Sequence, residues 1–324
     1  MGCLSRDGGG GAPGAARRGG GRPGAGEKVT TPRILSGREP AAALEAEVAE
    51  RVAALAAGGK EVGLATILVG EDPASQLYVR GKHRAAARVG MRSFDHALPA
   101  DTPAGDLVRL LDRLNADPSV DAILVQMPLP PHLDPVAFME RIDPAKDADG
   151  LHPANLGRLV LGRPGLWPAT PAGILRLLDH YGIETRGAFV VVVGRSFLVG
   201  RPLAILLGLK GRDATVALAH TATRDLLHLT RRADLVVAAA GHPGLIRREH
   251  VRPGATVVDV GANRTEEGVV GDVDFAAVSA VAGAITPVPG GVGPMTIAGL
   301  LENAVAAAEV RAGRQPFGWR PKAT

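Results

Sequence analysis

Four side chains suited to acid–base or polar binding chemistry lie in three separate stretches of the sequence. Tyr78 and Lys82 stand four residues apart, Gln126 follows an apolar run, and Asp149 belongs to KDADG. A lysine can transfer protons near neutral pH when burial and neighbouring groups lower its pKa. An ionised aspartate offers only acceptor oxygens, so it suits the N–H edge of a ligand. The fold would have to bring these groups together.

The first pair lies on a predicted helix. In EDPASQLYVRGKHRAAARVGM, Asp72 is the expected N-cap, Pro73 occupies the first helical position and Gly90 ends the helix. Residues four apart share one helix face, so Tyr78 and Lys82 point the same way. Taken alone, such a pair is more typical of an amphipathic helix with a solvated lysine. Other parts of the chain must therefore decide between the two interpretations.

The other two candidates also have ordinary explanations. Gln126 ends a buried strand predicted at 120–125, and the carboxyl ends of such strands are where α/β sheets bind ligands. A glutamine that caps loop backbone would look the same. Asp147 and Asp149 precede Gly150, but a calcium loop would need a third acidic position and a closing glutamate. We therefore expect an Asp-Gly turn and no metal site here.

A nucleotide-binding turn is predicted in the second half of the chain. Five apolar residues, Phe189 to Val193, run into Gly194-Arg195-Ser196, and Gly200 precedes another apolar run. A strand, a glycine turn and a helix are the outline of a dinucleotide-binding unit, in which phosphate lies against N–H groups at the helix N-terminus. The G-x-G-x-x-G spacing is not met, because Ser196 replaces the second glycine and the last comes one residue late. A tight turn without a ligand is the alternative.

The next strand indicates which nucleotide would bind. A strand predicted at 214–218 is followed by AHTATR, residues 219–224, where NAD enzymes usually place an acid for the ribose 2′-hydroxyl. No acid is present there. The basic side chains of Arg195, His220 and Arg224 suit a 2′-phosphate instead, together with the hydroxyls of Ser196 and Thr221. Further strands at 235–239 and 255–260 complete a βαβαβ half, and the sequence predicts NADP as cofactor.

Composition limits the other classes of protein. The chain has 324 residues, one cysteine and a net charge of +4, and residues 1–33 alone contribute six basic and two acidic side chains. Residues 1–30 are glycine-rich and predicted to be a disordered tail, although a mitochondrial transit peptide stays an alternative. Scarce aromatic residues argue against nucleic-acid binding, and no apolar run reaches the ~20 residues of a membrane span. Cys3 lies in the tail, so we expect no disulfides and a cytoplasmic location.

Several stretches, in this order, resemble the bifunctional methylenetetrahydrofolate dehydrogenase/methenyltetrahydrofolate cyclohydrolase family of the bacterial type. The motifs that carry the resemblance are DPAS-QLYVRGK, ILVQMPLP, KDADGLHPANLG, PATPAGILRLL, VVVGRSFLVGRP, VVDVG and ITPVPGGVGPMTIAGLLEN. The resemblance implies an α/β fold with a catalytic folate-binding domain at 31–150 and a Rossmann NADP-binding domain at 151–294. It further implies a C-terminal helix, 295–312, that returns to the first domain, and a homodimer.

The resemblance also assigns residues to sites. It implies a catalytic set of Lys82, Tyr78, Gln126 and Asp149, with the aspartate on the pterin. It implies that the folate is lined by Val125, Met127, Pro289, Gly290, Gly291, Val292 and Gly293, and that NADP is held by Gly194, Arg195, Ser196, Thr221 and Ala262. The sequence departs from the family pattern at Ala169, Ala262 and Thr221, where cysteine, isoleucine and serine are usual. None of these departures affects Lys82.

The implied activities are NADP-dependent oxidation of 5,10-methylenetetrahydrofolate and hydrolysis of the methenyl product to 10-formyltetrahydrofolate, steps of one-carbon metabolism and purine biosynthesis. Hydride transfer mainly requires two flat rings held face to face, whereas hydrolysis requires proton transfer, for which Lys82 is suited. An NADP-dependent dehydrogenase of another small metabolite, or a non-catalytic NADP-binding regulator, are the alternatives. Neither would need the set formed by Tyr78, Lys82, Gln126 and Asp149.

Overall fold

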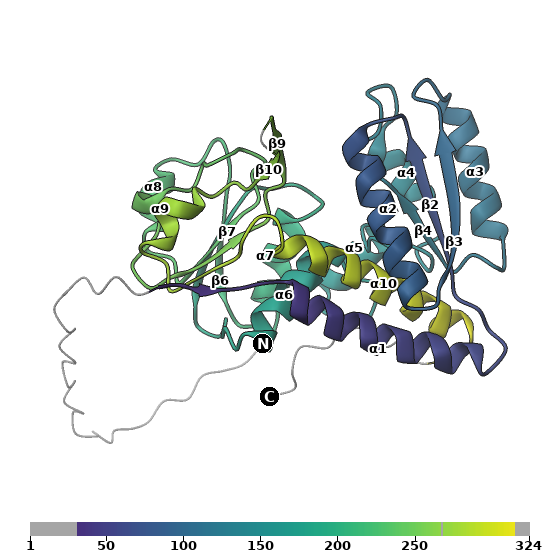
Figure 1. Cartoon of the computed structure of the whole chain (residues 1–324), viewed down its shortest axis with the longest axis horizontal. Coiled ribbons are helices and arrows are strands. Elements are labelled where there is room, and N and C mark those ends of the chain that lie inside the picture. Colours follow the sequence, from purple (N-terminus) through teal and green to yellow (C-terminus); the bar gives the residue numbers. More distant parts are fainter. Residues whose placement is uncertain (1–30, 267, 315–324) are drawn as a thin grey trace, which may run out of the picture.

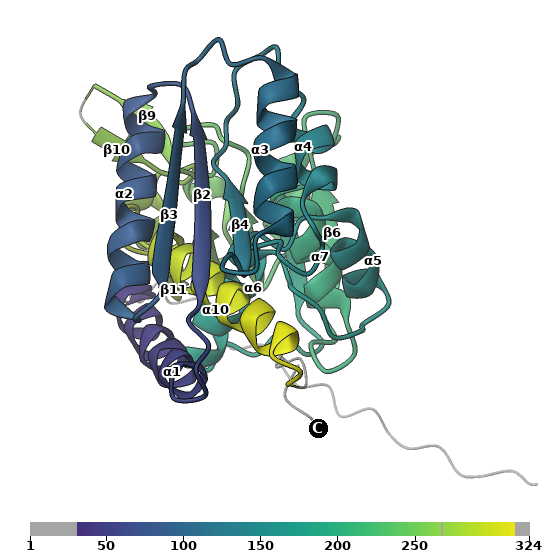
Figure 2. The same cartoon turned by 90° about the vertical axis from the view of Figure 1, so that its right-hand side faces the viewer.

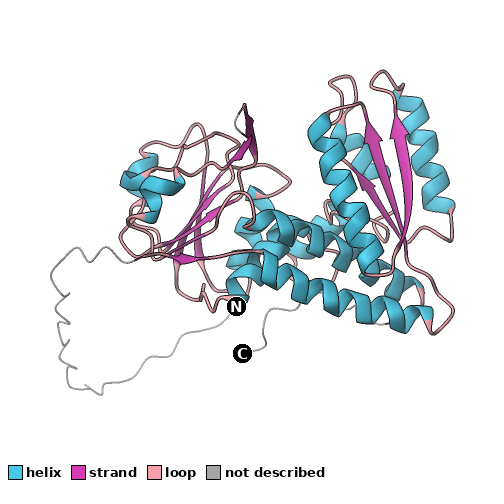
Figure 3. Ribbon diagram, in the orientation of Figure 1, coloured by secondary structure: helices cyan, strands magenta, loops and turns pink. Residues whose placement is uncertain are grey.

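A computed structural model describes residues 31–266 and 268–314 of the chain. Two α/β lobes stand side by side above a layer of long helices (Figures 1 and 3). The tail expected at residues 1–30, with Cys3, lies outside the described residues. In the described part, no helix is both long and apolar enough to cross a bilayer.

The first lobe is a small parallel sheet with helices on both faces. Its strand order is β3-β2-β4, and its strands are β2 (Gly63–Val69), β3 (Arg92–Leu98) and β4 (Ala122–Val125). Its helices are α2 (Pro73–Arg88), α3 (Ala104–Ala116) and α4 (Pro135–Arg141). Alternate residues of β2 and β4 face opposite cores, because side chains alternate along a strand. Leu64 and Leu124 pack toward α2, whereas Ile67 and Ile123 pack toward α3.

The helix that carries Tyr78 and Lys82 has the predicted boundaries. The carboxylate of Asp72 accepts a hydrogen bond from the Ser75 amide at 2.7 Å, and Pro73 is the first helical residue. Gly90 follows the helix with φ of +79°, a conformation that glycine adopts without strain.

The second lobe is a six-stranded parallel sheet in the order β1-β11-β8-β7-β5-β6. Its strands are β1 (Arg33–Ile34), β5 (Phe189–Val193), β6 (Thr215–Ala219), β7 (Leu235–Ala238), β8 (Thr256–Asp259) and β11 (Ala284–Ile285). Its helices are α5 (Pro153–Val160), α7 (Gly200–Gly208), α8 (Leu226–Thr230) and α9 (Phe275–Ser279), with a 3-10 turn, η1, at Arg248–His250. A small antiparallel hairpin, β9 (Asn263–Thr265) and β10 (Gly268–Val270), projects from this lobe toward the other (Figure 1).

Three long helices connect the lobes: α1 (Arg38–Ala56), α6 (Ala169–His180) and α10 (Val292–Arg311). Helix α10 packs against α1 and α6 and also contacts α2, β2 and β4 of the first lobe (Figure 2). Arg51 of α1 pairs with Glu309 of α10 at 2.7 Å, and Arg176 of α6 pairs with Glu302. The predicted return of the C-terminal helix to the first lobe is confirmed.

Two local expectations were wrong. In PATPAGILRLL, the sequence predicts Thr170 as the N-cap and Pro171 as the first helical residue. Helix α6 instead begins two residues earlier, at Ala169, and Pro168 is its N-cap. The Thr170 hydroxyl lies 3.0 Å from that of Thr296 in α10 instead. Residues 33–34 fall inside the expected first domain, yet β1 pairs with β11 of the second sheet. A strand of two residues carries no sequence signal for a partner some 250 residues away, so the sequence could not predict this pairing.

Candidate functional site

The predicted nucleotide turn lies between β5 and α7. An added Cβ at Gly194, where φ is +124°, would lie 1.9 Å from the Ala239 carbonyl oxygen, and one at Gly200 would lie 1.9 Å from the Gly194 oxygen. Both positions therefore exclude a side chain. The Ser196 hydroxyl accepts a hydrogen bond from the Val199 amide at 3.2 Å, which holds the turn at the start of α7. This geometry fits a cradle in which backbone approaches a phosphate closely.

The segment after β6 lies beside this turn. Val193 pairs with Ala219 across the parallel strands, and the Gly194 amide donates to the Ala219 oxygen at 2.9 Å. Arg195 and Thr221 are both exposed, one on each of these neighbouring turns. Residues 219–224 contain no acid that would repel a 2′-phosphate. The residues present therefore fit NADP.

Two buried carboxylates organise the ends of β7 and β8. Asp272 accepts hydrogen bonds from the Ala240, Gly241 and His242 amides at 2.6–2.9 Å. Asp259 accepts from the amides of Gly261, Asp272 and Val273 at 2.9–3.0 Å. Burial raises the pKa of Asp259 to about 6, against the opposing effect of its backbone donors. The pair fixes the glycine turns on which a cofactor would lie.

Lys82 is buried, with an exposed fraction of 7%, and its Nζ donates to Oε1 of Gln126 at 3.0 Å. The Gln126 amide nitrogen donates in turn to the Met127 oxygen at 2.6 Å, which orients the glutamine. Burial lowers the pKa of Lys82, and the charge of Asp149 opposes that shift. A lysine with a lowered pKa can accept and release a proton near neutral pH. The solvated-lysine interpretation is therefore wrong.

Asp149 lies close enough to Lys82 for each charge to alter the pKa of the other. Burial raises the pKa of Asp149 to about 6, Lys82 opposes this, and Asp147 adds to it. The segment before it extends the first sheet, because the Ile123 amide donates to the Lys146 oxygen at 2.7 Å and the Ala148 amide to the Ile123 oxygen at 3.2 Å. The continuation of β4 and this added segment thus present Gln126 and Asp149 beside Lys82.

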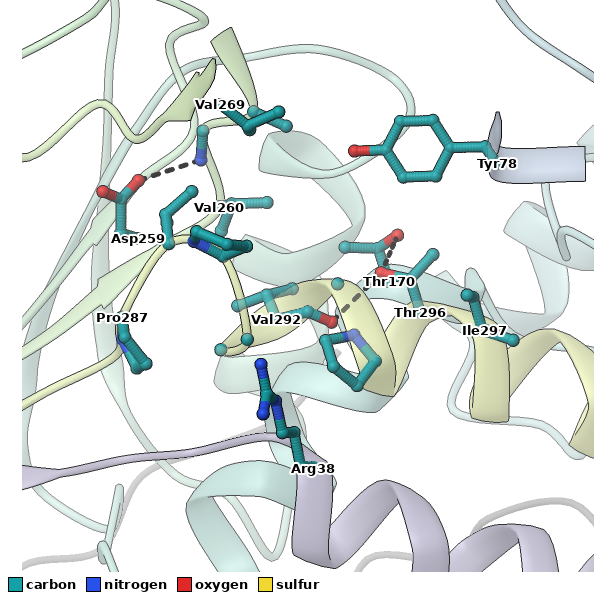
Figure 4. A pocket seen from close by; sticks show the side chains of 18 of the residues that line it. Arg38, Tyr78, Thr170, Asp259, Val260, Val269, Pro287, Val292, Thr296 and Ile297 are labelled. Carbon is teal, nitrogen blue, oxygen red and sulfur yellow. Dashed lines mark hydrogen bonds between the residues drawn. The ribbon is translucent and has the colours of Figure 1, made fainter. Parts of the chain in front are cut away.

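A cavity of about 660 Å³ opens between the two lobes. Figure 4 shows Tyr78 reaching into it from the first lobe, opposite Val260 and Val269 of the second. Its wall contains most of the predicted catalytic and folate residues and one of the cofactor set: Tyr78, Lys82, Gln126, Met127, Ala262, Pro289, Gly290, Gly291, Val292 and Gly293. Mostly apolar clefts of this size at a domain boundary are typical ligand sites.

Other predicted residues lie elsewhere. Gly194, Arg195, Ser196 and Thr221 are outside the cavity wall, at the neighbouring ends of β5 and β6. The Val125 side chain does not line the cavity, contrary to expectation. It is 3% exposed and packs in the core on the α3 face, because strand alternation turns it away from the α2 face. Only its backbone could meet a ligand.

Sequence reasoning missed several cavity residues, among them Arg38, Thr170, Val269 and Thr296. Arg38 is brought in by its neighbour Gly37, whose amide donates to the Gly290 oxygen at 2.8 Å. An added Cβ at Gly37 would lie 1.8 Å from the Gly291 oxygen. The glycine before a helix was the only signal, and it does not reveal its distant partner.

No metal site emerges from residues 31–266 and 268–314, where groups of three or more histidine, cysteine, aspartate or glutamate side chains do not converge.

Comparisons with known proteins agree with this geometry. Residues 35–149 match the catalytic domain of tetrahydrofolate dehydrogenase/cyclohydrolase, and residues 168–312 match its NAD(P)-binding domain. The bifunctional protein FolD of Acidiphilium cryptum is 55% identical over 280 residues, covering 86% of this chain and 99% of the relative. FolD 2 of Frankia alni is 54% identical over 280 residues, covering 86% and 96%.

Solved structures are similar over the same region. The bifunctional FolD enzyme of Campylobacter jejuni is 46% identical with a TM-score of 0.82, covering 86% of this chain and 99% of that one. The Trypanosoma brucei methylenetetrahydrofolate dehydrogenase-cyclohydrolase, solved with NADP and an inhibitor, is 42% identical with a TM-score of 0.82, covering 88% and 99%. This chain therefore belongs to the tetrahydrofolate dehydrogenase/cyclohydrolase family.

Proposed function

We propose that this protein oxidises 5,10-methylenetetrahydrofolate with NADP and hydrolyses the methenyl product to 10-formyltetrahydrofolate. One observation carries the proposal: a buried lysine, its glutamine partner and an aspartate lie together beside a cavity whose opposite wall is the carboxyl edge of a nucleotide-binding sheet. A dehydrogenase of another metabolite would not need this set on the first lobe.

The oxidation depends mainly on position. The substrate carbon lies between two nitrogens that stabilise the cation left when a hydride departs, so little acid catalysis is needed. Bound NADP supplies the hydride acceptor. Tyr78 and Met127 would hold the folate and Ala262 would contact the NADP, and the glycine-rich segment Pro289 to Gly293 lines the same cavity. Holding two reactants in this way can supply ~7–11 kcal/mol of the barrier.

The hydrolysis needs a proton acceptor. Water adds to the methenyl carbon, a C–O bond forms, and the water proton passes to the neutral Nζ of Lys82. The bond from that carbon to one ring nitrogen then breaks, and the lysine returns the proton to the departing nitrogen. The new hydroxyl loses its remaining proton to solvent as it becomes the formyl C=O, so the reaction releases one proton overall. Oε1 of Gln126 accepts a hydrogen bond from Nζ at 3.0 Å, a contact that would hold the amine in place for both transfers. Such a positioned group typically contributes ~10²- to 10⁴-fold.

The remaining first-lobe residues would orient the substrate. Ionised Asp149 accepts hydrogen bonds from the amino and ring N–H groups of the pterin, and Tyr78, which is 44% exposed, offers its ring for packing. Val125 would contribute backbone contacts only.

The cofactor would extend along the second lobe. We assign its phosphates to Gly194, Arg195 and Ser196, and its 2′-phosphate to Arg195 with Thr221, because these residues lie on adjacent turns and no acid opposes them. We accordingly assign folate binding to residues 31–150, apart from β1, with 295–312, and NADP binding to residues 151–294.

A coupled assay tests this function. Purified protein, methylenetetrahydrofolate and NADP should produce NADPH together with transient methenyl absorbance that then decays. NADPH formation only with other metabolites would favour a different dehydrogenase, and NADP binding without turnover would favour a regulator.

We also propose that the protein is a homodimer in the cytoplasm and binds no nucleic acid. The homodimer follows from the resemblance of the sequence to the family, and the location from the use of one cysteine in 324 residues. Light scattering coupled to size exclusion tests the dimer, since a mass of 33.3 kDa would contradict it.

A further inference from the structure

Asn303 is a buried polar residue in the middle of the otherwise apolar inner face of α10. It is 8% exposed, and its neighbours Leu300, Leu301 and Ala304 are core residues. Its Nδ2 donates to the Ala148 oxygen at 2.9 Å and to the Trp167 oxygen at 2.8 Å. One side-chain amide therefore links two separate chain segments, and both of them lie outside α10.

The first of these segments ends in Asp149. The carbonyl that Asn303 holds belongs to Ala148, immediately before the aspartate, and the Asp149 carbonyl accepts from the Ala169 amide at 3.0 Å. Gly150, just after it, has φ of +70° and passes so close to Trp167 that an added Cβ would lie 2.2 Å from that residue's carbonyl carbon. The backbone on both sides of Asp149 is thus fixed against the Trp167 segment.

The amide of Asn303 has a physical task in this arrangement. The Ala148 and Trp167 carbonyl oxygens both accept hydrogen bonds from one nitrogen. Without that donor, the oxygen of the fully buried Ala148 would lose its hydrogen bond, and nothing would tie the two segments together through α10. A buried acceptor without a partner is costly, so the segments would separate or admit water. Either response would move Asp149 relative to Lys82, which lies on α2.

We propose that Asn303 is a positioning residue for the pterin end of the active site, and that its amide sets where Asp149 stands relative to Lys82. This inference rests on the proposed roles of Asp149 and Lys82. It also gives α10 two tasks, because Val292 and Thr296 of the same helix line the cavity itself.

The test is Asn303→Leu, which removes both donors and keeps a similar volume. We expect the folate KM to rise at least tenfold, while the Kd for NADP stays within twofold of the wild-type value. The midpoint of the pH dependence of the folate KM should also shift from its wild-type value. The matched control is Val305→Ala, a fully buried change two residues along the same helix. It should lower the melting temperature but leave the folate KM and its pH dependence unchanged.

A wild-type KM and pH dependence in Asn303→Leu would overturn the proposal, as would an equal change in Val305→Ala. If Asn303→Leu does not fold, Asn303→Ser decides, because it keeps one small donor and should give an intermediate KM. A wild-type KM in Asn303→Ser would also refute the proposal.

Asp149→Asn separates this inference from the proposed function. An unchanged folate KM in Asp149→Asn would refute the role of the aspartate itself. A raised KM there, with a wild-type KM in Asn303→Leu, would refute only the positioning role. Asn303→Leu added to Asp149→Asn should raise KM less than it does in the wild type, since the group that it positions is already altered.

Discussion

Replacement of Lys82 by methionine should separate the two activities. Methionine keeps the length, the helix propensity and most of the packing, and removes the amine. A positioned proton-transfer group contributes ~10²- to 10⁴-fold, equivalent to ~2.7–5.4 kcal/mol of the barrier. We therefore expect cyclohydrolase turnover to fall at least ~10²-fold and dehydrogenase turnover to fall less, because hydride transfer depends chiefly on how the two rings are held.

The same change should have a modest effect on folding. Oε1 of Gln126 loses its hydrogen-bond donor, which should lower the free energy of unfolding by ~1–3 kcal/mol. The variant also no longer buries a group whose charged form is disfavoured by burial, which offsets part of that loss. The lowered pKa of Lys82 adds a pH signature, since the neutral amine accumulates only above that pKa. Wild-type hydrolysis should rise with pH until Lys82 is deprotonated, and the variant should lose this dependence.

The assay is single-turnover kinetics of both steps, with NADP affinity from fluorescence titration and stability from urea unfolding. Arg80→Met is the control, because Arg80 is an exposed residue of the same helix outside the cavity wall, and both activities should survive. Unchanged hydrolysis in Lys82→Met would remove the lysine from the mechanism. Lost NADP binding would show that the two sites are assigned to the wrong lobes.

Three further predictions concern carboxylates and the cofactor. Because the pKa of Asp149 is about 6, the folate KM should rise as pH falls through 6 in the wild type and stay high and flat in Asp149→Asn. Because the pKa of Asp149 in the folded protein lies above its ordinary value of 3.8, ionisation of this carboxyl destabilises the fold. The stability of the wild type relative to Asp149→Asn should therefore decline from about pH 4 to about pH 6, and a constant difference would contradict the shift. Asp272→Ala leaves three backbone amides without their acceptor and should lower the free energy of unfolding in urea by at least ~3 kcal/mol. The control Asp274→Ala removes an exposed helix cap and should lower it by ~1 kcal/mol, so equal losses in the two variants would refute the prediction. Efficiency, as kcat/KM, should favour NADP over NAD more than tenfold and Arg195→Ala should narrow that ratio, whereas equal use of both cofactors would exclude a 2′-phosphate contact.

The sequence alone determined what depends on neighbouring residues. The cap and proline at Asp72 and Pro73 fixed the start of α2, and a run of β-branched valines before Gly194 fixed the strand and turn of the nucleotide site. The missing acid after β6 indicated NADP without any structure, because that test needs only the identity of the residues after one strand. Spacing also placed Tyr78 and Lys82 on one helix face.

Only the tertiary structure decided which of these residues meet and in what environment. The Lys82 sequence context is equally typical of a solvated helix, and its burial and its contact with Gln126, 44 residues away, resolve that ambiguity. Val125 and Thr170 were misplaced because strand facing and helix start depend on what packs against them. Asn303 carried no local signal, and Arg38 carried only the glycine before it, since their roles arise from contacts more than 130 residues distant in sequence. Local preferences favour a start and an exposed face for each element, but the partner of that face is set by non-local packing, and where the two conflict, as at the start of α6, packing outweighs the local preference.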